Sequence, residues 1–149
     1  MRFSKVYKQK QGRVVTKLNI GIVFLAVLIT GSYNSPMDTA ELYLPSSGVS
    51  CALPKLPDSR YYHTVDSKGL LCGGAGSSGD TCLQWSPDTG TWEEDRLTLS
   101  VWRYDHVSWT PGPDIGTYLM GGSNSGRTTT LIKPDGTQEP CFLLEYDTA

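Results

Sequence analysis

Two segments of the chain each carry an arginine three residues before a histidine: Arg60 with His63, and Arg103 with His106. A histidine can act as a general base, but neither one lies beside a repeated serine, cysteine or carboxylate as a catalytic triad requires. Because the pair recurs, we expect structural roles, with imidazoles satisfied by backbone groups and guanidinium groups bridging carbonyls or a carboxylate. We therefore predict no catalytic residue and no enzymatic activity.

The four cysteines are the second set of residues able to do chemistry. Their spacing contains no Cys-x-x-Cys pair, and the two histidines are far apart, so we predict neither a metal site nor a cofactor. An even number of cysteines in an exported chain is typical of a disulfide framework, and four cysteines allow three pairings. Cys72 and Cys82 end adjacent predicted strands, which favours a bond between them. Cys51 and Cys141 then pair with each other or with cysteines that this sequence lacks.

The head of the chain indicates export. Six of the 13 basic residues fall in the first 17 positions, which hold no acid, and an apolar run from Ile20 to Ile29 follows. This layout is typical of a secretory signal peptide, which we predict over residues 1–31 and expect to be removed. The alternative is a signal-anchor helix that contacts the membrane through residues 18–30. Either outcome places residues 32–149 outside the cytosol, in a secreted or a single-pass membrane protein.

The exported part has a net charge of −8, which argues against a nucleic-acid partner. Its apolar runs are short and are separated by turn residues, as in Pro87-Asp88-Thr89-Gly90 and Pro134-Asp135-Gly136. Glycine supplies the positive φ that such turns need, and proline presets their first position. We therefore predict an all-β fold after the head. The expected strands are Leu42–Leu44, Tyr61–Val65, Leu70–Cys72, Cys82–Trp85, Tyr104–Trp109, Thr117–Met120, Thr129–Ile132 and Phe142–Tyr146.

A set of residues recurs in order along these strands. Each Arg-x-x-His segment is followed by a strand that ends in a glycine pair, Gly73-Gly74 in the first copy and Gly121-Gly122 in the second. A further strand and a Pro-Asp turn come next, and Trp92 closes the first copy but has no tryptophan counterpart in the second. The period of roughly 40–50 residues is that of a blade in a repeat protein. The ordered set resembles kelch repeats.

The resemblance implies that each repeat is one four-stranded blade of a partial β-propeller. It divides the exported part into a partial blade at 39–59 and blades at 60–102 and 103–149. In such a blade the glycine pairs allow close backbone approach, and Trp92 fills the gap between blades. A propeller closes with about 4–8 blades, so we expect either a fragment of about two and a half repeats or a ring completed by self-association through open blade edges.

The same resemblance implies a function. It suggests an exported binding or scaffold module that mediates protein–protein, cell-surface or matrix interactions. The expected partner is an extracellular protein or a glycan. The alternative is a fragment of a propeller-bearing carbohydrate-active enzyme, similar to galactose oxidase.

Overall fold

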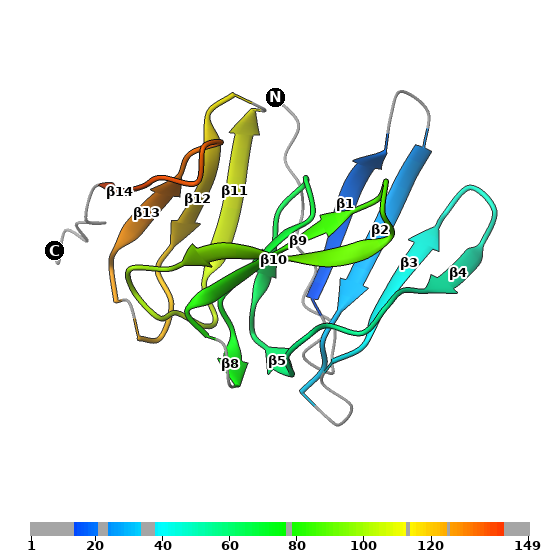
Figure 1. The fold of residues 1–149 in the computed structure, drawn as a ribbon, viewed down its shortest axis with the longest axis horizontal. Coiled ribbons are helices and arrows are strands. Elements are labelled where there is room, and N and C mark those ends of the chain that lie inside the picture. The colour runs from blue at the N-terminus through cyan, green and yellow to red at the C-terminus, as the bar shows by residue number, and fades with distance from the viewer. Residues whose placement is uncertain are drawn as a thin grey trace, which may run out of the picture.

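The computed structural model of the protein describes residues 14–20, 24–33, 38–76, 79–112, 114–124 and 126–141. These residues form fourteen antiparallel β-strands and no helix, so the expected all-β fold is confirmed. Within the same residues, no helix is long and apolar enough to cross a membrane. The strands are arranged in three four-stranded sheets and one short two-stranded sheet (Figure 1).

Sheet 1 contains the first four strands in chain order: β1 (Val14–Ile20), β2 (Phe24–Thr30), β3 (Ala40–Leu44) and β4 (Val49–Ala52). Sheet 2 contains β6 (Thr64–Val65), β7 (Leu70–Cys72), β9 (Thr81–Ser86) and β10 (Thr91–Thr98), again side by side in chain order. A small separate pair, β5 (Arg60–Tyr61) and β8 (Ala75–Gly76), flanks sheet 2. Sheet 3 contains β11 (Val107–Gly112), β12 (Gly116–Met120), β13 (Thr129–Ile132) and β14 (Gln138–Cys141).

The three sheets share one register. The residue that precedes the glycine turn after each second strand pairs with a residue near the start of the third strand. Each third and fourth strand are then joined by a tight turn whose last glycine has positive φ, which only glycine adopts without strain. The equivalent cross-strand pairs are Thr30 with Ala40, Cys72 with Cys82, and Met120 with Thr129.

Sheet 2 lies between the other two sheets, and a hydrophobic core fills each junction (Figure 1). Alternate residues of a strand point to opposite faces, so Leu71 and Leu83 face sheet 1 while Cys72 and Cys82 face sheet 3. The first core consists of Leu28, Leu56, Val65, Leu71, Leu83 and Trp85. The second consists of Cys72, Cys82, Leu97, Leu99, Leu119 and Ile132.

The structure describes the predicted signal or anchor segment only in part. Within the segment predicted as a signal or anchor, Val14–Ile20 and Phe24–Thr30 are strands of sheet 1, whereas residues 1–13 and 21–23 lie outside the described residues. Leu28 is fully buried in the core between sheets 1 and 2. An apolar run of this length suits a buried strand as well as a signal peptide. In the described residues the run pairs with β3, and the predicted signal or anchor role of residues 1–31 stays a prediction.

The other strand predictions differ at the first and the outer strands of the sheets. The expected strands Tyr61–Val65 and Tyr104–Trp109 are interrupted by the turns at Tyr62 and Asp105, so β6 begins at Thr64 and β11 at Val107. The structure adds β4, which is short and fully exposed, and β10, which is largely polar, because each is paired to its neighbour through a tight turn. The expected strand at Phe142–Tyr146 lies outside the described residues, and the outer strand of sheet 3 is β14 instead. Sheet 1 therefore contains the residues expected as a partial blade together with part of the expected leader.

Candidate functional site

The two arginines of the repeated motif make equivalent hydrogen bonds in neighbouring sheets. Arg60 is fully buried; its Nη1 donates to the carbonyls of Gly73 (3.3 Å) and Thr81 (3.2 Å), and its Nη2 donates to Thr81 Oγ1 (3.0 Å). The partly exposed carboxylate of Asp58 lies 3.5 Å from Nη2. Burial lowers the pKa of Arg60 below its ordinary value, and Asp58 opposes that shift. The guanidinium therefore ties the glycine turn of sheet 2 to its third strand.

Arg103 repeats this arrangement in sheet 3. Its Nη1 donates to the carbonyls of Leu119 (3.0 Å), Gly121 (3.3 Å) and Thr128 (3.4 Å), and its Nη2 donates to Thr130 Oγ1 (2.9 Å). Five donors in a planar fork suit this clustering of carbonyls, which a lysine could not reproduce. Thr128 occupies the position of Thr81, because the amide of the preceding turn glycine bonds to each of them.

The turn glycines that follow the second strands of sheets 1 and 2, Gly31 and Gly73, lie where two sheets meet. A Cβ placed on Gly73, whose φ is +67°, would stand 2.5 Å from the Arg103 carbonyl oxygen and 2.7 Å from His106 Cε1. The same atom on Gly31, at φ +63°, would stand 2.5 Å from the Arg60 carbonyl oxygen and 2.6 Å from His63 Cε1. The Arg-x-x-His turn of each sheet thus packs on the glycine turn of the sheet before it, and no larger residue fits.

The histidines complete these junctions. His63 Nε2 lies 2.8 Å from Thr30 Oγ1, and His106 Nε2 lies 2.9 Å from Thr64 Oγ1. Burial, reinforced by the neighbouring arginine, lowers the pKa of His63 well below its ordinary value and that of His106 to about 3. Both rings are therefore neutral at pH 7. Neither buried Nδ1 has a hydrogen-bond partner within the described structure, so each ring is best written with its proton on Nε2, donating to threonine.

The two threonines come from different strands. Val14 pairs with Thr30 in sheet 1, and the equivalent pair in sheet 2 is Thr64 with Cys72. One residue of each pair supplies the hydroxyl that bonds to the histidine of the next sheet. In sheet 1 this is Thr30 on the second strand, and in sheet 2 it is Thr64 on the first strand. Because Cys72 is committed to a disulfide, the hydroxyl of sheet 2 stands on its cross-strand neighbour. β2 therefore makes the same histidine contact as the equivalent part of sheet 2, although its sequence resembles a leader.

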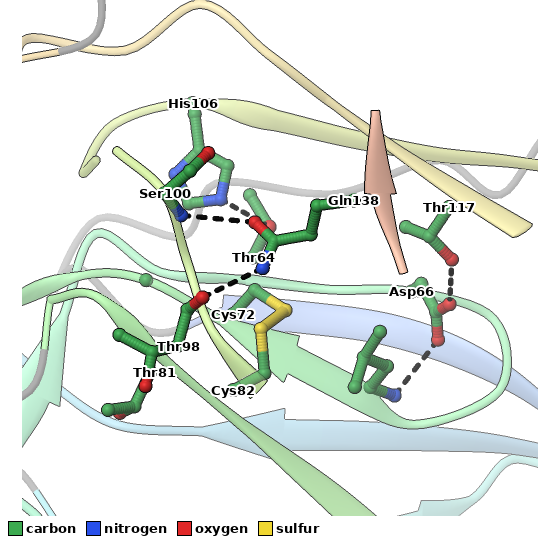
Figure 2. Close-up of a disulfide and its surroundings, with 12 residues drawn as sticks. Thr64, Asp66, Cys72, Thr81, Cys82, Thr98, Ser100, His106, Thr117 and Gln138 are labelled. Carbon is green, nitrogen blue, oxygen red and sulfur yellow. Dashed lines mark hydrogen bonds between the residues drawn. A yellow bond between two sulfur atoms is a disulfide. The ribbon is translucent and has the colours of Figure 1, made fainter. Parts of the chain in front are cut away.

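The expected disulfide between Cys72 and Cys82 is present (Figure 2). It joins β7 to β9 at directly paired positions, and both residues are buried in the core between sheets 2 and 3. Cys51 and Cys141 are free thiols on the outer strands β4 and β14. These strands lie at opposite ends of the molecule, so the alternative bond between Cys51 and Cys141 does not form within one chain (Figure 1).

Trp92 bridges sheet 2 to the chain leaving sheet 1. Its indole N–H donates to the Pro54 carbonyl oxygen (2.9 Å), and its ring packs on Trp85 with centroids 5.1 Å apart. In sheet 3 the same register position is held by Gln138, whose Nε2 donates to the Thr98 carbonyl oxygen (2.7 Å) (Figure 2). Sequence comparison of the repeats missed this equivalence because an indole and an amide share only the N–H donor.

Asp66 is a buried carboxylate that the sequence did not single out. Its Oδ1 accepts from the amides of Lys68 and Leu70, which closes the turn between β6 and β7. Its Oδ2 accepts from Thr117 Oγ1 (2.6 Å) and Thr110 Oγ1 (3.1 Å) of sheet 3, so one side chain joins two sheets (Figure 2). The Asp-Ser-Lys-Gly sequence signalled the turn, but nothing in it signalled the second sheet.

Aromatic side chains gather around the turns at one end of the junctions. We call Tyr33, Tyr61, Tyr62, Trp102 and Tyr104 the aromatic face. The first three rings contact one another with centroids 5.1 to 5.9 Å apart, and Trp102 contacts Tyr104 at 5.9 Å. The two groups adjoin because the amide following Tyr104 donates to the Tyr62 carbonyl oxygen. Tyr33 is 56% exposed and Trp102 45% exposed.

Tyr62 has a φ of 57°, a region that bulky residues rarely adopt. Asp105, at the same position of the next repeat, has a φ of 58°, which aspartate tolerates better. Because the positive φ recurs in both repeats, it belongs to the shared turn, and the ring of Tyr62 lies partly exposed beside Tyr33 and Tyr61.

A cavity of about 490 Å³ lies beside β9 and β10 and is lined by Asp58, Thr81, Cys82, Leu83, Glu94, Leu97 and Thr98. Its two carboxylates come from different elements, and Asp58 is already paired with Arg60. No group of three or more metal-binding side chains occurs among the described residues. Among known proteins, the sequence matches no family model and no curated protein.

Proposed function

We infer that this chain is a binding or scaffold module built from kelch-like blades, with no catalytic role. The observation that carries this proposal is that the repeated ionisable residues and the aromatic residues occupy different environments. The ionisable residues of the repeated motif are buried and bonded within the junctions, whereas the aromatic face is partly exposed. Aromatic rings bury large area and stack on flat ligand surfaces, which suits binding.

Three features support a propeller-like assembly of the sheets. Each sheet has four antiparallel strands in chain order, as a kelch blade does. The first strand of sheet 2 contacts the first strands of both sheet 1 and sheet 3, which is the arrangement of inner strands about an axis. The Arg-x-x-His turn docks on the glycine turn of the preceding sheet at both junctions.

We place the module outside the cytosol on the strength of the Cys72–Cys82 disulfide, because such bonds persist in oxidising compartments. Cleavage after Gly31 would remove β1 and β2, and with them Leu28 from the core and the Thr30 hydroxyl from His63. We therefore propose that the folded module keeps residues 14–31, as an alternative to the expected cleavage. N-terminal sequencing of protein recovered from the culture medium distinguishes a start before Val14 from a start at Ser32.

The binding proposal is tested with the full chain against a glycan array and against immobilised extracellular-matrix proteins. We expect saturable binding to at least one class, and at least a tenfold loss of affinity in Tyr33→Ala. Tyr33→Phe keeps the ring and should bind normally, and Ile115→Ala is an exposed apolar control outside the aromatic face. Turnover of a carbohydrate probe, or equal binding by all four proteins, would contradict the proposal.

A further inference from the structure

The outer strand of sheet 1 has a free edge. β4 (Val49–Ala52) pairs with β3 on one side, and no strand of the described structure pairs with its other side. All four residues of β4 are exposed, and Figure 1 shows the strand at the rim of sheet 1. An edge strand of this kind offers unpaired backbone groups to another strand.

The backbone groups on the free edge of β4 belong to Ser50 and Ala52. The amide of Leu53 donates to the Ala40 carbonyl oxygen (2.9 Å), so Leu53 turns its backbone groups toward β3. The register of β3 and β4 has no bulge, and alternate residues of an antiparallel strand direct their N–H and C=O groups to opposite sides. Ser50 and Ala52 therefore each direct one donor and one acceptor away from β3.

The outer strands of the other two sheets are protected against such pairing. In β14 the amide of Lys133 donates to the Thr137 carbonyl oxygen, which places Pro140 at an outward position, and proline has no N–H to offer. β10 carries three consecutive acidic residues at 93–95. Proline and charged residues on an edge strand prevent edge-to-edge pairing. Of the three outer strands, only β4 contains neither.

The edge of β4 is complementary to itself in an antiparallel arrangement centred on Cys51. Ser50 of one copy then lies opposite Ala52 of the second copy, and the outward N–H of each meets the outward C=O of the other. The two-fold axis repeats this pair on the other side of Cys51. Val49, which is 47% exposed in one chain, comes to lie opposite Leu53 of the second copy, so apolar surface is covered as well.

This arrangement brings the Cys51 thiols of the two copies opposite each other. Cys51 is an exposed free thiol, and because its two neighbours form the hydrogen-bonded pairs, it takes a non-hydrogen-bonded position, where opposing side chains are closest. The chain already holds a disulfide at such a position. The amide of Gly73 donates to the Thr81 carbonyl oxygen (3.0 Å), so the adjacent pair, Cys72 and Cys82, is a non-hydrogen-bonded one.

We propose that β4 is a dimerisation edge, through which two copies of the chain pair antiparallel and become linked by a disulfide between their Cys51 residues. The contact is isologous, because the same strand meets itself across a two-fold axis. It therefore closes with two chains and does not extend into a filament.

The link forms by thiol–disulfide exchange, with glutathione disulfide as the oxidant. The Cys51 thiolate of one copy attacks a sulfur of glutathione disulfide, so that a mixed disulfide forms, the glutathione S–S bond breaks and one glutathione leaves. The Cys51 thiolate of the second copy attacks the Cys51 sulfur of the mixed disulfide and releases the other glutathione. Each thiol gives its proton to solvent, and each released glutathione thiolate takes one up. Two cysteines are oxidised, and glutathione disulfide is reduced to two molecules of glutathione.

The test is the covalent mass of the full chain after equilibration in a buffer of oxidised and reduced glutathione. We expect twice the chain mass in non-reducing electrophoresis and in intact mass spectrometry, and a return to the mass of one chain with excess reductant. Cys51→Ser should keep the mass of one chain. Cys141→Ser is the matched control, because it removes the other free thiol and should still link.

A second pair of variants separates strand pairing from simple reactivity of the thiol. Ser50→Pro removes an outward N–H at both symmetric positions and should slow linkage about tenfold at equal protein concentration. Ser50→Ala keeps the amide and should link at the parent rate. Tryptophan fluorescence confirms that each variant keeps its fold.

Three results would overturn the proposal. They are a mass of one chain for the unmodified protein, with or without bound glutathione, a link that depends on Cys141, and equal linkage rates for Ser50→Pro and Ser50→Ala. Each of them leaves the binding function untouched, because that function is tested on the aromatic face through Tyr33.

Discussion

The buried neutral histidines make stability depend on pH in a way that can be calculated. In the unfolded chain a histidine titrates near pH 6.5, whereas in the fold the pKa of His106 is about 3 and that of His63 lies well below its ordinary value. Above pH 6.5 both forms of the chain hold neutral rings and the stabilisation is complete. As pH falls from 6.5 toward 3, only the unfolded chain takes up protons, so the free energy of unfolding decreases.

The size of the effect follows from the same pKa values. At pH 5, protonation of one unfolded histidine lowers the free energy of unfolding by about 2 kcal/mol. His106 should therefore cost about 2 kcal/mol between pH 7.5 and pH 5, and His63 adds a loss in the same direction. Carboxylates contribute below this window, because the pKa of Asp38, lowered by its hydrogen bond to Lys55, and that of Asp135, lowered by Thr137, both lie under 3.8.

Urea unfolding at the two pH values, followed by tryptophan fluorescence, measures this directly. His106→Gln keeps an N–H donor but does not titrate, so its loss of stability between pH 7.5 and 5 should be about 2 kcal/mol smaller than that of the parent chain. Thr64→Val is the control: it removes the partner hydroxyl and lowers stability at both pH values but keeps the titrating ring. The reasoning is refuted if His106→Gln and the parent chain lose equal stability on acidification.

Three further changes test the junctions. Replacing Cys72 and Cys82 together with alanine should lower the free energy of unfolding by about 3 kcal/mol, since the bond closes a short loop; thermal unfolding with and without reductant checks it, and a reductant effect on the double variant would contradict it. Asp66→Asn should cost about 2 kcal/mol because charge-assisted bonds to two sheets are weakened, and an unchanged urea midpoint would argue against the bridging role. Leu28→Ala should cost about 2–5 kcal/mol in the intact chain if β2 is a core strand, whereas a leader residue would tolerate the change.

Much of the secondary structure could be predicted from residues that are close together in the sequence. Short apolar runs between glycine and proline turns determine strands and hairpins, because turn geometry depends on residues that are adjacent in the chain. The recurrence of Arg60 and His63 as Arg103 and His106 indicated structural roles, and the spacing of Cys72 and Cys82 indicated their bond. These inferences needed only sequence neighbours or a repeated pattern.

The tertiary structure decided the features that depend on contacts between sheets. The run ending at Ile29 is equally apolar in a leader and in a buried strand, and only pairing with β3 and packing against Leu71 assign it to sheet 1. Gln138 and Trp92 share a register position that residue similarity hides, because both act through a single N–H. The bond from Asp66 of sheet 2 to Thr117 of sheet 3 was hidden for a similar reason: the sequence shows the turn that Asp66 closes, but only the packing of the sheets brings Thr117 to its second oxygen.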